Sequence, residues 1–130
     1  MKENNINLLE SKELIENNPM HIATVSSDYK PNLSVAADVR VIEENKIIIS
    51  HNEMVNTPKN ILTNKNIVLT SFNKKWEGLR MKGTAEYYKD GEYYDFCKKT
   101  FFANGEITSF GATKPKGAIV VTVEKCEELK

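Results

Sequence analysis

The clearest structural signals lie in one central stretch, KIIISHNEMVNTPKNILTNKNIVLTSF, residues 46–72. Its first residues, KIIIS (46–50), form a continuous apolar run that suits a strand buried on both faces. Its last residues, NIVLTSF (66–72), have the β-branched and apolar character of a second strand. A short helix is predicted between them over 57–64, because its first two residues are threonine, a favoured N-cap, and proline, a favoured first helical residue.

Further strand patterns lie on both sides of this stretch. Upstream, MHIATVS (20–26) ends at the turn cluster SSDYKPN, after which LSVAADVRVI (33–42) resumes a strand pattern. Downstream, LRMKGTAEYY (79–88) follows the polar turn NKKWEG, and AIVVTVEKCEEL (118–129) forms the last strand. We therefore expect six strands, joined mainly by hairpins.

Two more helices are expected. Apolar residues recur at helical spacing within 6–17 and stop at a proline. A stripe of aromatic residues, interpreted as core packing, recurs at helical spacing within 90–105, with Asp90 as a cap and Asn-Gly at 104–105 as a terminator. Because hairpins replace regular βαβ alternation, the pattern predicts one domain over 1–130. This domain is expected to be a small, mainly β (α+β) antiparallel barrel rather than a doubly wound sheet.

Composition and missing motifs exclude several functional classes. The 18 basic and 18 acidic side chains balance, so no net field attracts nucleic acid or anionic lipid. Two distant cysteines, an N-terminus without a secretory signal and the lack of any apolar run of about 20 residues predict a soluble, cytoplasmic protein with no membrane contact. The common nucleotide, hydrolase and zinc motifs are absent, and the two histidines are not spaced as ligands, so no metal site is expected.

The loop before the central helix could bind an anion. A helix N-terminus carries a partial positive charge and unpaired N–H groups, and Thr57, Asn52 and Asn56 add a hydroxyl and two amides. Lys59 could add a formal charge, and His51 lies at a strand exit, where loop residues commonly line sites. The simpler alternative is that Thr57 only caps the helix and the asparagines form a turn, and the residues alone favour this alternative.

Two other features allow two interpretations each. Arg80 and Lys82 share one face of a strand, where they could contact a phosphate or form a solvated surface. Trp76 lies in a turn and could stack on an aromatic ligand or cover an end of the barrel.

Four segments form a recognisable combination: MHIATVSSDYKPNLSVAADV, KIIISHNEMVNTPKNILTNKNIVLTSF, WEGLRMKGTAEYY and AIVVTVEKCEEL. Together they resemble the pyridoxamine 5′-phosphate oxidase-like, FMN-binding split-barrel family, especially its short single-domain members. The resemblance runs from Met20 to the end of the chain. It implies a six-stranded antiparallel split barrel with two or three short helices, paired as a homodimer with FMN in each of two interface clefts.

The resemblance also implies where FMN lies. The loop and helix start around Thr57 would hold the phosphate, the strand after the first turn would contact the isoalloxazine ring, and a strand exit at His51 would follow the ribityl chain. Lys82 would help to neutralise the phosphate, and a loop that contains Lys116 would extend over the partner's flavin. The implied cofactor-binding residues are Ser34, Val35, Ala36, Ser50, His51, Asn52, Met54, Val55, Asn56, Thr57, Lys82 and Lys116.

Two departures from the family pattern bear on function. Short members often carry a basic residue just before the phosphate-binding threonine, where this chain has Asn56, so we expect weaker FMN binding or a preference for another ligand. Longer oxidase members carry an arginine where this chain has Ser34, together with basic residues for pyridoxamine phosphate. We therefore do not expect a vitamin oxidase.

The resemblance implies a flavin-dependent oxidoreductase or flavin electron carrier that works with a small-molecule redox partner or substrate. No catalytic residue is identified, because a flavin brings its own redox chemistry. One alternative is a non-catalytic ligand-binding or sensing barrel for haem or F420, in which His51 or His21 would be the axial ligand of haem. Another alternative is a dimeric interaction module with an empty cleft.

Overall fold

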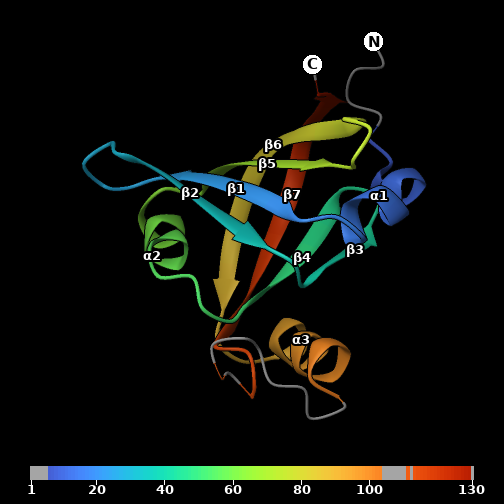
Figure 1. Ribbon diagram of the computed structural model, residues 1–130. Helices are drawn as coiled ribbons and strands as arrows, with labels where there is room; N and C mark the ends of the chain where they lie inside the picture. The colour runs from blue at the N-terminus through green and yellow to red at the C-terminus, as the bar shows by residue number, and fades with distance from the viewer. Residues whose placement is uncertain (1–5, 104–110, 112, 130) are drawn as a thin grey trace.

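The computed structural model describes residues 6–103, 111 and 113–129 (Figure 1). The elements are, in chain order, η1 (Leu8–Ser11), α1 (Lys12–Glu16), β1 (Met20–Val25), β2 (Pro31–Ala36), β3 (Val39–Glu43), β4 (Lys46–His51), α2 (Asn56–Thr63), β5 (Asn66–Phe72), β6 (Gly78–Tyr88), α3 (Glu92–Phe101) and β7 (Gly117–Glu128). None of the helices in these ranges has the length and apolarity required to cross a membrane.

The strands form one antiparallel sheet in the order β2-β1-β5-β6-β7-β4-β3, with the expected β1–β2 and β5–β6 hairpins. The described residues contain seven strands instead of the six predicted, because the run 33–42 bends at Ala37 and Asp38 into β2 and β3. The bend is required since β2 pairs with β1 at one edge of the sheet, whereas β3 pairs with β4 at the other.

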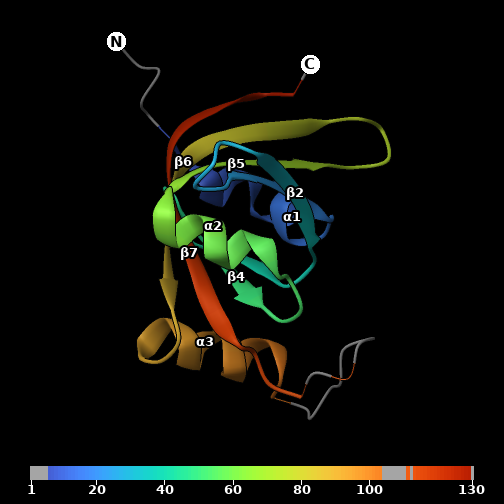
Figure 2. The ribbon, with the colours of Figure 1, turned by 90° about the vertical axis from the view of Figure 1, so that its left-hand side faces the viewer.

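This bend also closes the sheet into a split barrel. Ala36 ends β2 and Val39 begins β3, so three Cα–Cα steps, which span about 11 Å at most, connect the two edge strands. The sheet must therefore curl until its edges approach at this corner, as Figures 1 and 2 show. The predicted fold class, a mainly antiparallel split barrel with short helices, is confirmed.

Apolar side chains from nearly every strand fill the barrel. The interior contains Met20, Ile22, Val39, Val41, Ile47, Ile49, Leu69, Met81, Ala85, Ile119 and Val121. On the outer face of β4 and β7, α3 covers a second cluster formed by Ile48, Cys97, Ala118 and Val120. Strand β4 is thus buried on both faces, as the run KIIIS predicted.

The aromatic stripe of α3 packs largely as expected. Tyr93 and Phe101 lie against the second cluster, and Cys97 is fully buried within it. Burial raises the pKa of the Cys97 thiol to about 12, so the thiol is neutral and acts as a small apolar side chain. The cap of α3 is Gly91 rather than Asp90, and the terminator expected at 104–105 lies outside the described residues.

The predicted N-terminal helix is divided into η1 and α1, and its last residue protects an edge strand. The Glu16 carboxylate accepts the Val41 N–H of β3 at 2.8 Å and pairs with Lys12 at 2.7 Å and with Arg40 at 3.9 Å. An edge strand has unpaired backbone groups that can recruit other chains. Glu16 covers one of these groups on β3 and surrounds it with charge.

Candidate functional site

The start of α2 meets the inner face of β2 through two hydroxyl groups. Thr57 Oγ1 lies 2.6 Å from Ser34 Oγ, and Asn32 Nδ2 donates to Thr57 Oγ1 at 3.3 Å. Ser34 Oγ also lies 3.4 Å from Met54 Sδ. Thr57 is fully buried. The structure therefore brings together Ser34, Met54 and Thr57, three residues that the sequence placed at one site.

The prediction that Thr57 caps α2 was wrong. The helix begins at Asn56 with Val55 as N-cap, and no side chain caps it, because Val55 has no polar side-chain atom. Thr57 lies inside the first turn, with its hydroxyl bonded to β2. The first N–H groups of a helix have no intrahelical partner, and Pro58 has no N–H group at all. Asn56 and Lys59 are exposed beside these donors. The N-terminus of α2 thus offers uncapped donors and the positive end of the helix dipole.

His51 is buried, with 7% of its surface exposed, and both ring nitrogens are engaged. Nε2 lies 2.6 Å from the Met54 carbonyl oxygen and Nδ1 lies 2.5 Å from the Tyr87 hydroxyl. A carbonyl only accepts, so Nε2 carries the proton and the neutral ring accepts at Nδ1 from Tyr87. Burial is the main cause that lowers the pKa of His51. His51 thus holds the loop at Met54 in place.

A second polar network holds the exit of β4. Ser50 Oγ donates to Asn52 Oδ1 at 2.7 Å, and Asn52 Nδ2 donates to Asp38 Oδ2 at 2.8 Å. The Ser50 N–H donates to the Asp38 carbonyl at 2.9 Å. Asp38 was not predicted as a site residue, although it is the single acidic residue in the strand pattern 33–42 and could have been noticed for that reason. The network joins the barrel corner to the loop before α2.

Three of the expected residues contribute differently. Lys82 lies on the outer face of β6, where it pairs with Glu127 at 3.8 Å beside the pair of Arg80 and Glu127 at 3.1 Å. Val35 points to the opposite face of β2 from Ser34, because neighbouring strand residues alternate. The Lys116 N–H donates to the His51 carbonyl at 2.7 Å, and its side chain is exposed.

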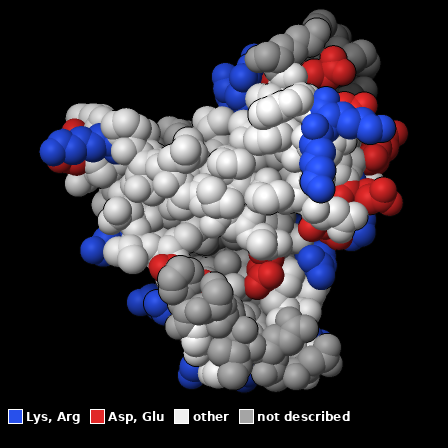
Figure 3. All heavy atoms as spheres, viewed as in Figure 1, with Lys and Arg blue, Asp and Glu red and all other residues white. Residues whose placement is uncertain are grey.

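The outer face of β2, β1 and β5 is apolar and open to solvent. Leu33, Val35 and Trp76 are exposed by 67%, 55% and 75%. The His21 ring stacks on Phe72 at 5.5 Å, and Phe72 stacks on Trp76 at 5.2 Å. Figure 3 shows few charged side chains over β1 and β2. An exposed apolar patch of this kind commonly marks an interaction surface.

The curled antiparallel sheet and its short helices define a split barrel. The model of the pyridoxamine 5′-phosphate oxidase family matches residues 10–130, and the chain belongs to this family. The uncharacterized protein MJ0282 of Methanocaldococcus jannaschii is 37% identical over 118 residues, which cover 89% of this chain and 76% of that protein.

Solved structures share the architecture. HupZ of Group A Streptococcus is 28% identical, with a TM-score of 0.81 over 93% of this chain and 92% of HupZ. An FMN-binding protein of Syntrophomonas wolfei is 19% identical, with a TM-score of 0.78 over 95% of this chain and 86% of that chain. An F420 reductase is 20% identical, with a TM-score of 0.64 over 88% of this chain and 94% of the reductase chain. At these last two identities the likeness concerns the fold alone. No cluster of metal-ligating side chains occurs in the ranges that the structure describes.

Proposed function

We propose that this protein binds FMN and functions, as a homodimer, as a flavin-dependent oxidoreductase or flavin electron carrier. The observation that carries the proposal is the contact between Ser34 and Thr57, which places strand β2 against the uncapped start of α2. Family membership supports FMN as the ligand, because many members of this fold hold a flavin phosphate at the equivalent loop.

The donors around α2 fit a phosphate monoester without an arginine. The Ser34 hydroxyl donates to Met54 Sδ at 3.4 Å, and because a thioether is a weak acceptor this proton can turn to a ligand oxygen instead. The exposed residues of the first turn, Asn56 and Lys59, add an amide and an ammonium group. Helix N-termini bind phosphate through such donors and through the helix dipole.

Strand β2 fits the flavin ring. It is an edge strand that pairs only with β1, so the backbone groups along its other side are not used by the sheet. Ser34 and Ala36 are small, which allows a flat ring to approach this backbone. When bound, the flavin supplies the redox chemistry, while the chain binds and orients it. The hydrogen bonds of His51 and Asn52 would keep the neighbouring loop in its binding conformation.

A second copy of the chain would cover the outer face of β2, β1 and β5. Leu33 and Val35 project from β2 on the side opposite to Ser34, so a partner seated there would lie next to the strand that contacts the ring. Burial of these side chains would supply the apolar centre that specific interfaces need. The homodimer would therefore form beside the flavin site.

Absorbance and binding measurements test the proposal. We expect the purified protein to be yellow, or to quench the fluorescence of added FMN at saturation. Riboflavin, which has no phosphate, should bind more weakly because it cannot use the α2 donors. A colourless protein that leaves FMN fluorescence unchanged would overturn the proposal, and equal affinity for riboflavin would place the phosphate elsewhere.

Haem and F420 are the competing ligands. A haem iron ligated by His51 would have to displace either Tyr87 from Nδ1 or the Met54 carbonyl from Nε2, so the geometry favours FMN over ligation by His51. The F420 reductase shares the fold, and F420 therefore belongs in the same titration as FMN. An increase in melting temperature identifies the ligand, because binding only to the folded state must stabilise it.

A further inference from the structure

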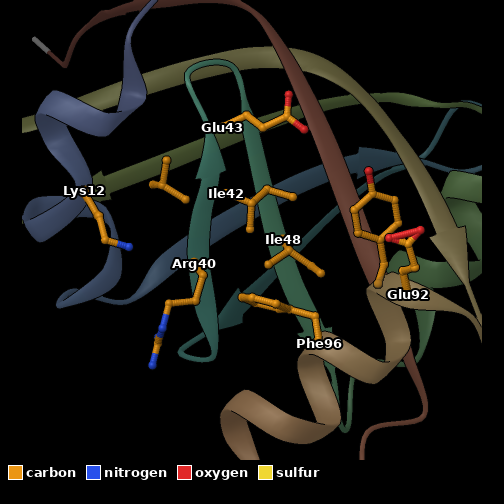
Figure 4. Close-up of a pocket in the computed structure, with 9 residues that line it drawn as sticks. Lys12, Arg40, Ile42, Glu43, Ile48, Glu92 and Phe96 are labelled. Carbon is orange, nitrogen blue, oxygen red and sulfur yellow. The ribbon is translucent and has the colours of Figure 1, made fainter.

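A cavity lies between α1, the outer face of β3 and β4, and the start of α3 (Figure 4). Its volume is about 660 Å³, within the range of about 300 to 1,000 Å³ that is usual for small-molecule sites. None of the residues that line it belongs to the site at α2. Its function can therefore be argued independently of the proposed flavin binding.

The cavity has an apolar floor with fixed walls. Ile42, Ile48 and Phe96 line it, and Phe96 is 37% exposed although it is fully apolar. Tyr93 also lines the cavity and packs against Tyr88 with ring centroids 5.0 Å apart. A ligand with an apolar body would bury this floor without first having to order it.

Two carboxylates at the rim have no cationic partner. Glu43 ends β3 and Glu92 begins α3, and Figure 4 shows both on the far side of the cavity from Lys12. Among the described residues neither forms an ion pair. Glu92 interacts favourably with the dipole of α3, but this leaves its outer oxygen atoms available.

The two cations of the lining share one carboxylate, Glu16. Glu16 binds Lys12 and Arg40 and is itself held by the Val41 N–H. The Arg40 guanidinium also lies 4.8 Å from the centre of the Phe101 ring and donates to a backbone carbonyl at 2.9 Å. These contacts keep Arg40 from turning toward the rim carboxylates. Lys12 and Arg40 face three carboxylates, Glu16, Glu43 and Glu92, so the charge around the cavity is negative by one unit.

We propose that this cavity binds an organic ammonium ion with an apolar body, such as an arylalkyl amine. The ammonium group lies at the rim, where Glu43 and Glu92 supply the negative charge, and the aromatic ring of the ligand packs against Phe96 on the floor. The apolar body covers Ile42 and Ile48. An anionic ligand is disfavoured by the two rim carboxylates, and a neutral ligand gains only the apolar contact.

An NMR titration with phenethylamine tests this proposal. We expect the backbone amide signals of Ile42, Ile48 and Phe96 to shift during the titration, with a Kd of about 1 mM. Phenethyl alcohol, the neutral analogue, should bind several-fold more weakly, and hydrocinnamate, the anionic analogue, should not bind. Equal binding of the amine and the alcohol, or no shift with the amine, would overturn the proposal.

Charge-removing variants test the assigned carboxylates. The double variant Glu43→Gln/Glu92→Gln should weaken phenethylamine binding about fivefold, because ion pairs of exposed carboxylates contribute modestly. Glu124→Gln, which removes an exposed carboxylate of β7, should leave binding unchanged. If the double variant does not give the dispersed NMR spectrum of a folded protein, the two single variants Glu43→Gln and Phe96→Ala replace it, since neither side chain is buried. Unchanged affinity in folded variants would show that the carboxylates do not hold the ligand.

Discussion

Ser34 Oγ and Thr57 Oγ1 lie 2.6 Å apart, although the two residues are 23 positions apart in the chain. This contact joins an edge strand of the barrel to the first turn of α2. Thr57 thus lies inside the first turn and bonds across the site, while the cap position falls to Val55, which has no hydrogen-bonding side chain. A hydroxyl pair of this kind can reorganise around a bound oxyanion.

Thr57→Val should weaken FMN binding. The substitution keeps the size of the side chain but removes a hydroxyl, and the loss of one phosphate hydrogen bond costs about 1 to 3 kcal/mol. Fluorescence titration measures the change, and Thr63→Val at the exposed end of the same helix is the matched control. If both variants bind like the original protein, the phosphate does not contact Thr57.

Asn56→Arg should strengthen FMN binding. A charge-assisted hydrogen bond to phosphate contributes about 1.5 to 3 kcal/mol, and position 56 is exposed beside the start of α2. Riboflavin affinity should not change, because riboflavin has no phosphate. The control is Asn66→Arg, which adds the same charge at the start of β5. A similar gain with the control would indicate general charge attraction rather than a local contact.

Folding stability should fall as the pH drops below 6.5. Burial lowers the pKa of His51 from 6.5, so the unfolded chain takes up a proton at a higher pH than the folded chain does. The stability contributed by His51 is fully present above that value and is lost progressively below it. Urea unfolding between about pH 7.5 and 5.5 measures how steeply the free energy of unfolding changes with pH. The free energy of unfolding should change less with pH in His51→Gln than in the original protein. An equal change in both proteins would show that His51 is not the group responsible.

Gly83→Ala should destabilise the protein more than Gly117→Ala. An added Cβ at Gly83 would overlap the backbone carbonyl of Thr122, whereas one at Gly117 would overlap the end of the Tyr87 side chain. Backbone cannot move as freely as a side chain, so we expect at least about 3 kcal/mol at Gly83 and about 1 to 3 kcal/mol at Gly117. Urea denaturation gives both values, and the reverse order would show that Tyr87 is fixed more rigidly than the strand.

Leu33→Lys should convert the proposed dimer into a monomer. The side chain is exposed in the single chain, so the substitution should leave the fold intact while placing a charge inside the interface. Light scattering coupled to size-exclusion chromatography measures the mass. Leu62→Lys, at an equally exposed apolar residue of α2, should leave the mass unchanged. A dimer that survives Leu33→Lys must use another surface.

Most elements were predictable because their signals are local. The apolar run 46–50 required burial on both faces, and the turn residues between 26 and 33 required a hairpin. The division of 33–42 was not predictable, because its two halves have one continuous strand pattern. Only their pairing with β1 and β4, at opposite edges of the sheet, separates them.

The site divides in the same way. The polar loop before α2, with Thr57 and Asn56, was apparent from residue types and capping preferences. The roles of its members were not, because Thr57 bonds to Ser34 instead of its own helix, His51 holds the Met54 carbonyl, and Asn52 binds Asp38. Each of these contacts depends on how the barrel closes. Hydrogen bonds between distant segments leave no periodic pattern in a single chain, so they become visible only when the strands are assembled.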